Sequence, residues 1–478
     1  MKNYFGRDEE TADFLRLFQK KSASLIVCHG RRRVGKSTFI SQCAAKANHF
    51  FRFEGLPPRA GITRADQLAV FAERLARQTS APKLTLESWP QAFGLLASLL
   101  PKGNTTIVLL LDEISWMANG DPDFAGHLKA VWDNEFSKFP RLIMVLCGSV
   151  SSWIDENILN STGFVGRCSR TFRLQPLTLP YCNQFWGKTR ERIGSAEKLK
   201  ILAVTGGIPR YLEEINPSLT AEKNIEALCF TQGALLFNEF EQIFHDIFNK
   251  RAETYRSIVE TLVEGRRTLT DISRMLKRKR GGDMTAALHD LSEAGFIHQD
   301  TAFNPETGKD DGAIGFRLSD NYLRFHLKYV APVRGQIEKG LYQWTPLETL
   351  QAWDTIMGLQ FENLIHQNLH VVMRKIGLGN IPVLNAGPYA QTKTQRRKPC
   401  QVDLLIRTKQ SLYVFETKFR RNVRKTVIEE VKEKIARMKL PSTLSIRTGL
   451  IYDGKLEEGV READYFDFLV PFGDLLEP

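Results

Sequence analysis

The chain has 478 residues, too many for one core, and at roughly 100–200 residues per domain the length predicts about three domains. The hydrophobic share of 42% and the charged share of 25% are typical of a globular protein, and no apolar run approaches the roughly 20 residues of a bilayer span. The net charge of +12 favours a polyanionic partner, while seven scattered cysteines without a Cys-x-x-Cys pair predict a reducing cytoplasm and argue against a disulfide framework or zinc site.

A glycine-rich loop follows the first predicted strand. Residues 24–28 form a short apolar run, residues 30–37 match the pattern G-x-x-x-x-G-K-[ST], and helical character follows. In such a loop the backbone N–H groups wrap the phosphates of a nucleotide, and the positive end of the helix dipole faces them. Lys36 then reaches the β- and γ-phosphates, and the Ser37 hydroxyl is suited to bind Mg²⁺. The predicted nucleotide-binding residues of this loop are Gly30, Arg31, Arg32, Arg33, Val34, Gly35, Lys36, Ser37 and Thr38.

A second apolar run, residues 107–111, reads as a buried parallel strand that ends in two acids. Asp112 is placed to hold Mg²⁺, and Glu113 is placed to polarise the attacking water. The alternative is a strand that merely ends in an acidic cap. A third apolar run, within residues 141–153, ends in small polar residues that include Ser149.

Six segments in this half carry a family resemblance. FGRDEE (residues 5–10), GRRRVGKS, LLLDE, LCGS, GRCSR and GGIPRYL together resemble the prokaryotic AAA+/STAND-related ATPases that are often called archaeal-type ATPases. The resemblance covers roughly residues 1–235, and it implies an α/β fold with a parallel sheet and a helical lid.

The same resemblance implies further contacts with ATP. It places Ser149 where a polar residue senses the γ-phosphate, and it makes Arg167 and Arg170 candidates for an arginine finger. Arg210 follows a helix break at Gly206 and would face the nucleotide from the lid. Each of the three arginines is otherwise an ordinary surface residue.

The middle of the chain predicts a winged helix-turn-helix. Helical patterns cover residues 254–265 and 268–277, the second with an expected cap at Thr270. Residues 282–300 predict a third helix that leads to Gly295 and is followed by a β-like Phe-Ile-His, the start of a hairpin. Five Lys or Arg residues within 274–282 precede the third helix, which favours contact with DNA phosphates. A spacer between domains is the open alternative, and the turn-rich loop 304–315 is either the wing tip or an exposed insertion.

Charged residues within apolar runs mark the C-terminal part. Asp403 opens one predicted strand, and Glu416 and Lys418 lie two residues apart in the next, within a stretch of eleven Lys or Arg and two acids between Lys393 and Lys425. Residues two apart face one side of a strand, so Glu416 and Lys418 project together. Converging carboxylates repel each other unless a divalent cation lies between them. The alternative is the exposed charged face of an edge strand.

With Glu362 on the preceding helix, predicted over 353–372, the order Glu, Asp, Glu-x-Lys resembles the PD-(D/E)XK nuclease family. The resemblance covers roughly residues 345–478, although Val402 stands where proline is expected before the aspartate. It implies a restriction-endonuclease-like α/β domain in which Asp403 and Glu416 bind the metal and Lys418 orients the water or neutralises the transition state. The implied catalytic residues are Glu362, Asp403, Glu416 and Lys418. An inactivated domain that only binds stays open.

These segments predict an α/β protein of three domains, 1–235, 236–345 and 346–478. The predicted function is an ATPase that uses ATP and Mg²⁺, coupled to metal-dependent cleavage of nucleic acid, with DNA as the expected substrate. We expect no membrane partner and allow for a homo-oligomer. The alternatives are a STAND-like signalling or defence switch whose C-terminal domain binds without cleaving, and a motor for DNA loading or transposition.

Overall fold

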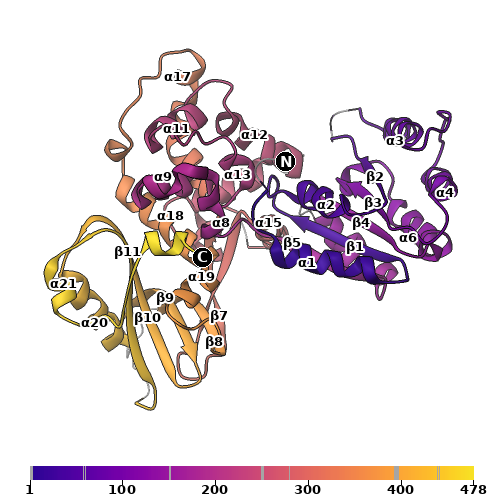
Figure 1. The fold of residues 1–478 in the computed structure, drawn as a ribbon. Helices are drawn as coiled ribbons and strands as arrows, with labels where there is room; N and C mark the ends of the chain where they lie inside the picture. The colour runs from indigo at the N-terminus through magenta and orange to yellow at the C-terminus, as the bar shows by residue number, and fades with distance from the viewer. Residues whose placement is uncertain are drawn as a thin grey trace. The chain divides into compact units, whose positions relative to one another are not determined.

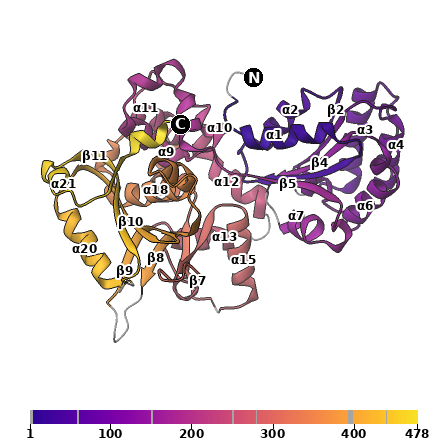
Figure 2. The same cartoon turned by 60° about the horizontal axis from the view of Figure 1, so that its bottom comes forward.

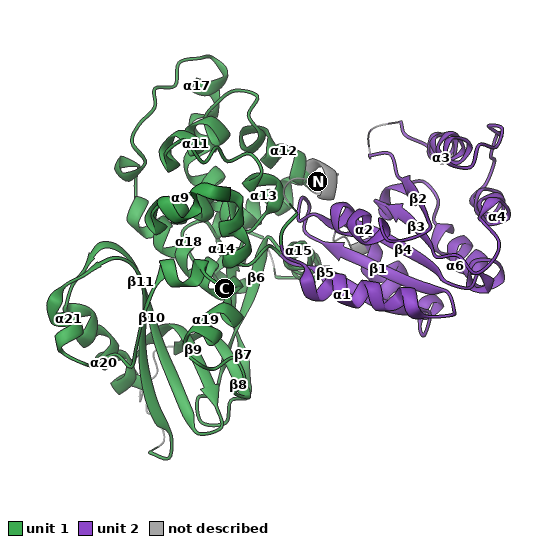
Figure 3. Cartoon of the chain, in the orientation of Figure 1, with its two compact units in different colours: residues 1–5, 176–244, 250–478 green, residues 6–175, 245–249 purple. Residues whose placement is uncertain are grey.

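The computed structural model describes residues 4–57, 59, 61–149, 152–248, 252–278, 280–391, 398–438, 440 and 442–478 (Figures 1 and 2). The chain folds into two compact units (Figure 3). Unit 2 comprises residues 6–175 and 245–249, and unit 1 comprises residues 1–5, 176–244 and 250–478. The predicted domain boundaries at residues 235 and 345 both lie within unit 1, so the three-domain division stays a prediction. No helix in the described ranges is both long and apolar enough to cross a bilayer.

Among the described residues, unit 2 is built on a five-stranded sheet in the order β2-β3-β4-β1-β5, with every neighbouring pair parallel. Its strands are β1 (Ser24–Gly30), β2 (His49–Glu54), β3 (Ile107–Asp112), β4 (Leu142–Ser149) and β5 (Cys168–Leu174). The expected parallel sheet of a P-loop ATPase is therefore present. Because parallel strands align their carboxyl ends, Gly30, Asp112 and Ser149 come to one edge of this sheet.

Helices cover both faces of the unit 2 sheet, and successive residues of β1 enter two separate cores. Val27 packs with Phe71 and Trp89 in one core, while Cys28 packs with Phe14 and Phe39 in the other. A strand buried on both faces needs apolar residues at every position, which explains its continuous apolar run. The helices are α1 (Asp8–Arg16), α2 (Lys36–Ala44), α3 (Arg64–Thr79), α4 (Trp89–Leu99), α5 (Ile114–Met117), α6 (Phe124–Asn134) and α7 (Ser152–Ile154).

The helices that open unit 1 share a core with the C-terminal sheet. Leu199 and Leu202 belong to the same buried cluster as Phe361, Leu404 and Phe415. The segment predicted as a helical lid is thus packed against the predicted nuclease-like part. The helices of this segment are α8 (Leu179–Asn183), α9 (Ser195–Thr205), α10 (Pro209–Leu212) and α11 (Ala221–Cys229). They are followed by α12 (Leu235–Phe248), whose residues from 245 onwards belong to unit 2.

The C-terminal part is a mixed five-stranded sheet in the order β12-β11-β10-β9-β8, counted over the described residues. β8, β9 and β10 pair antiparallel, whereas β10, β11 and β12 pair parallel. Core residues of α18 and α19 pack on one face and those of α20 on the other. The elements are α18 (Trp353–Gln367), α19 (Leu369–Lys375), β8 (Val383–Gln391), β9 (Cys400–Thr408), β10 (Ser411–Val423), α20 (Thr426–Met438), β11 (Ser445–Leu456), α21 (Glu458–Glu462) and β12 (Phe468–Pro471).

The single helix expected over 353–372 is interrupted. It is divided between α18 and α19 at Asn368, where the Asn368 side chain accepts a hydrogen bond from Leu179 N and donates one to Leu364 O. A side chain that bonds to nearby backbone competes with the helical ladder, which accounts for the break.

Between these parts lie three helices and a hairpin in the order that the sequence predicts. They are α13 (Ala252–Thr261), α14 (Leu269–Met275), α15 (Gly282–Glu293), β6 (Ile297–Phe303) and β7 (Asp310–Leu318), followed by α16 (Asn321–Phe325) and α17 (Arg334–Glu338). The cap of α14 is Thr268 and not Thr270, because Thr268 and Asp271 form a reciprocal capping box. The order fits a winged helix, whose identity stays a prediction.

The turn of the β6–β7 hairpin contacts the C-terminal sheet. Arg407 Nε donates a hydrogen bond to Pro305 O at 2.9 Å, and Asn385 Nδ2 donates one to Asp310 Oδ1 at 2.8 Å. Of the predicted loop 304–315, residues from Asp310 onwards belong to strand β7, and the turn before them is held against β8 and β9. Lys279 of the neighbouring basic cluster lies outside the described residues.

Candidate functional sites

The glycine loop of unit 2 has the backbone that its sequence predicts. A Cβ at Gly30 would lie 2.4 Å from Leu174 O of β5, so only glycine fits there. Arg33 and Gly35 have φ angles of 67° and 91°, in the left-handed region, and α2 begins directly afterwards at Lys36. The loop therefore turns sharply between β1 and α2 and brings the helix N-terminus to the carboxyl edge of the sheet.

Lys36 is held over this loop. Its side chain is 6% exposed, and its Nζ donates hydrogen bonds to Gly30 O at 3.0 Å, Arg31 O at 3.3 Å and Ser149 Oγ at 3.4 Å. Ser37 is half-buried and Thr38 is exposed at the start of α2. A single ammonium group thus connects the glycine loop with the end of β4.

The two acids at the end of β3 lie in different surroundings. Asp112 is 2% exposed, and its Oδ2 accepts a hydrogen bond from Arg52 Nη2 at 2.7 Å. Glu113 Oε2 accepts one from Ser149 N at 3.3 Å. Burial, together with the charge of Asp112, raises the pKa of Glu113 although Lys36 lowers it. A carboxylate with a raised pKa beside the loop suits a group that accepts a proton from water.

Arg167, Arg170 and Arg210, the three arginines predicted to contact ATP from outside the glycine loop, each have an acidic partner in their own unit. Arg167 forms two hydrogen bonds with Asp133, at 2.7 Å and 2.9 Å, and the pKa of that acid is lowered to about 2. Arg170 pairs with Asp13. In unit 1, Arg210 pairs with Glu213 at 3.3 Å and Glu214 at 2.7 Å. Their contacts with ATP stay predictions.

The second candidate site lies where β9 and β10 part. The last paired residues of this antiparallel hairpin are Leu404 and Phe415. Beyond them β9 stays paired with β8 and β10 with β11, so Asp403 and Glu416 are the first residues of the gap. We call this place the fork. Thr417 bridges the two strands at this place, because its N and Oγ1 donate hydrogen bonds to Asp403 Oδ2 at 2.8 Å and 2.9 Å.

Two lysines neutralise the buried carboxylate of the fork. Glu416 is 4% exposed, and it accepts hydrogen bonds from Lys418 at 2.9 Å and from Lys434 of α20 at 2.5 Å. Burial and the charge of Asp403 raise the pKa of Glu416, and the two lysines oppose this. Burial disfavours the charge of Lys418, yet Glu416 and Glu430 raise the pKa of its amine, so it stays protonated. Lys434 and Glu430 were not predicted from the sequence.

Glu362 of α18 supplies a third acid. Burial and the charge of Asp403 raise its pKa to about 8, although three arginines lower it. Gln360 and Asn363 of the same helix donate hydrogen bonds to Asn321 O of α16 at 2.7 Å and to Leu318 O of β7 at 2.8 Å, which fixes the helix against both elements. Glu362 therefore lies within electrostatic range of Asp403, and its catalytic role stays a prediction.

The fork has donors that suit Mg²⁺. No group of three or more His, Cys, Asp or Glu in the described ranges is arranged to hold a metal ion. Mg²⁺ in phosphate-processing enzymes is commonly bound by one or two carboxylates together with water and substrate phosphate. Asp403 and Glu416 can supply two carboxylates, provided that Lys418 and Lys434 release the oxygens of Glu416. In unit 2, Ser37 and Asp112 are the corresponding donors beside the glycine loop.

Comparisons with known proteins concern the part of the chain that contains the glycine loop. Residues 4–215 match a family model described as "ATPase domain predominantly from Archaea". The uncharacterized protein MJECL04 of Methanocaldococcus jannaschii is 22% identical over 373 residues, which are 77% of each chain. The Walker-type ATPase PABY2304 of Pyrococcus abyssi is 16% identical with a TM-score of 0.49, over 68% of this chain and 96% of that one. The Aeropyrum pernix ORC2 protein, in ADPNP-ADP complexes, is 13% identical with a TM-score of 0.43, over 71% and 97%.

The raised pKa of Glu362 predicts a dependence of stability on pH. The carboxyl ordinarily titrates near 4.5, whereas in the folded protein it titrates near 8, so between these values the folded state keeps a proton that the unfolded chain releases. The contribution of the Glu362 carboxyl to the free energy of unfolding is therefore fully present below about pH 4.5, and it is lost as the pH rises towards 8. Glu362→Gln removes this loss.

We expect the free energy of unfolding of Glu362→Gln, relative to wild type, to rise by at least about 1 kcal/mol between about pH 5 and about pH 8. Urea unfolding in the presence of EDTA measures it. Glu433→Gln is the control, because Glu433 is exposed and paired with Arg437 on α20. The same pH dependence in wild type and Glu362→Gln would contradict the assignment.

Proposed function

We propose, from the premise that residues 4–215 form a P-loop ATPase domain, that this protein couples ATP hydrolysis to cleavage of nucleic acid. ATP would bind at the loop between β1 and α2, and a phosphodiester bond would be cleaved at the fork between β9 and β10. The observation that carries the second half is the convergence of Asp403, Glu416 and two lysines where the strands part. DNA is the expected substrate.

At the ATP site, the roles follow from the contacts of each side chain. Lys36 neutralises the outer phosphates, and Glu113, whose pKa is raised by burial, accepts a proton from the attacking water. Ser149 orients Glu113 through its backbone N–H. Ser37 and Asp112 would hold Mg²⁺, which supplies positive charge to the β- and γ-phosphates. Arg52 must release Asp112 for that role, because it now occupies one carboxylate oxygen.

At the fork, the protein supplies charge and proton transfer. Asp403 and Glu416 would hold a divalent ion, which lowers the pKa of a bound water and stabilises the leaving oxygen. Lys418 orients the water or neutralises the pentavalent phosphate of the transition state. Lys434 lies on the other oxygen of Glu416 and holds that carboxylate in place.

The middle helices and hairpin fit two roles. The basic cluster before α15 supports contact with DNA phosphates by a winged helix. The contacts of the hairpin turn with Arg407 and Asn385 support a spacer that fixes the C-terminal sheet. The two roles are compatible, since the cluster and the turn lie at different places along the segment.

A second candidate function is a STAND-like switch whose C-terminal part binds nucleic acid without cleaving it. The observation that favours it is the neutralisation of Glu416 by two lysines, which leaves a metal fewer free carboxylate oxygens. Such a protein would retain its nucleotide through purification and turn ATP over very slowly.

For the ATP site, Glu113→Gln should keep ATP binding and lower hydrolysis by roughly 10²–10⁴-fold, the usual contribution of a general base. Phosphate release and binding of a fluorescent ATP analogue measure the two quantities. Lys36→Ala is the companion variant and should lose binding itself. Unchanged phosphate release by Glu113→Gln would contradict the role given to Glu113.

For the fork, Lys418→Ala should lower cleavage on the order of 10²–10³-fold, the cost of removing one charge-stabilising donor, and leave ATP hydrolysis unchanged. Labelled DNA and RNA substrates with Mg²⁺ or Mn²⁺ measure it. Lys409→Ala is the matched control, because Lys409 is exposed in the turn of the same hairpin. Wild-type cleavage no higher than that of Lys418→Ala defeats the nuclease half and leaves the switch.

A further inference from the structure

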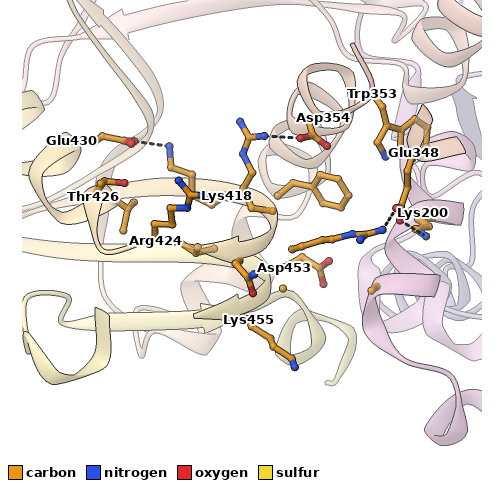
Figure 4. Close-up of a pocket in the computed structure, with 18 of the residues that line it drawn as sticks. Lys200, Glu348, Trp353, Asp354, Lys418, Arg424, Thr426, Glu430, Asp453 and Lys455 are labelled. Carbon is orange, nitrogen blue, oxygen red and sulfur yellow. Dashed lines mark hydrogen bonds and ion pairs between the residues drawn. The ribbon is translucent and has the colours of Figure 1, made fainter. Parts of the chain in front are cut away.

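A large pocket includes Lys418 of the fork among its lining residues. It has a volume of about 1300 Å³ and lies within unit 1. Its walls come from the start of α9, the residues before and at the start of α18, the end of β10, the start of α20 and the end of β11. In Figure 4, Lys200 and Glu348 stand on one side of it and Lys418 and Glu430 on the other. We call it the strand pocket.

Positive charge exceeds negative charge in the strand pocket. Its lining includes the acids Glu348, Asp354, Glu430 and Asp453. Its cations are Lys200, Lys418, Arg420, Arg421, Arg424 and Lys455. The surplus suits an anion that touches several cations at once, as a chain of phosphates does.

The acids of the strand pocket fix some of these cations along its walls. Arg420 pairs with Asp354 at 2.7 Å, and Lys200 pairs with Glu348 at 3.3 Å. Arg424 and Lys455 are exposed and, among the described residues, have no ion-pair partner. These two are therefore available to a ligand without the loss of an existing ion pair.

The shape and lining of the strand pocket select the class of ligand. A volume of about 1300 Å³ exceeds the roughly 300–1,000 Å³ of small-molecule pockets, which favours a polymer. Glu416 and Lys418 lie two residues apart on one face of β10. From Lys418 onwards, through a register shift between Phe419 and Asn422, the end of β10 lines the pocket, so this strand connects the pocket with the fork. Phe419 contributes a half-buried ring to the lining. Cations beside an aromatic ring are the composition of sites for single strands, since the bases of a duplex are already stacked inside it.

We propose that the strand pocket binds a single-stranded segment of nucleic acid that extends from the phosphate at the fork. Because Lys418 belongs to both places, this role rests on the proposed function of the fork. Lys200 of α9 lies in the segment that matches the ATPase family, so the pocket is also walled by a residue from that segment. A strand bound there would contact both the segment that matches the ATPase family model and the C-terminal sheet.

The test is the affinity of the full chain for fluorescent oligonucleotides, measured by anisotropy without Mg²⁺, so that cleavage does not enter the readout. Arg424→Ala/Lys455→Ala should bind single strands on the order of tenfold more weakly, with a slope of affinity against salt reduced by about 1.4 for the two lost phosphate contacts. The charge-matched control is Lys409→Ala/Lys432→Ala, two exposed lysines outside the pocket. Single-stranded DNA, single-stranded RNA and duplex DNA are the three arms.

Weaker binding of single-stranded DNA or RNA by the pocket variant alone supports the proposal, and the arm that binds more tightly identifies the sugar. Equal losses in the pocket variant and the control, no loss in either, no binding by wild type, or binding of duplex alone would each overturn it. The proposed function fails separately. If wild type binds single strands through Arg424 and Lys455 but cleaves none with Mg²⁺ or Mn²⁺, the pocket stands and the nuclease falls.

Discussion

Where β9 and β10 part, backbone pairing gives way to contacts between charged side chains. A buried carboxylate such as Glu416 is costly unless it is paired, and here Lys418 and Lys434 provide the pairing. Asp403 is held in turn by Thr417, which donates the hydrogen bonds that a strand neighbour would otherwise provide. These contacts hold the carboxylates of Asp403 and Glu416 close to the amines of Lys418 and Lys434. The chemistry of the fork depends on this parting of the strands, because a continuous ladder would leave no gap between Asp403 and Glu416.

The family match and the compact units divide the chain at different places. Residues 4–215 match the ATPase family model, whereas the first segment of unit 2 ends at Gln175 and unit 1 continues from residue 176. The remaining part of the match, including α9, shares a core with α18 and the C-terminal sheet. Packed cores resist internal deformation, so this segment and the sheet would move as one body. A displacement of residues 176–215 would thus reach the fork through this shared core as well as through the chain.

The sequence predicted the parts of both sites that lie close together in the chain. The glycine loop, Asp112 and Glu113 follow from local patterns, and the two-residue spacing of Glu416 and Lys418 places them on one face of a strand. Lys434 escaped prediction because a charged helix position looks like a solvated face until the helix is packed on the sheet. The pairing of Arg52 with Asp112 could not be predicted either, because it depends on β2 and β3 being neighbours in the sheet.

Calorimetric titration of nucleotide-free protein with Mn²⁺ measures whether Asp403 and Glu416 of the fork bind a divalent cation. Wild type should bind Mn²⁺ at a site that Asp403→Asn/Glu416→Gln lacks. The control is Glu429→Gln/Glu433→Gln, which removes two exposed acids of α20 and should leave the binding unchanged. Equal heats of binding in wild type and in the fork variant would contradict a cation site at Asp403 and Glu416.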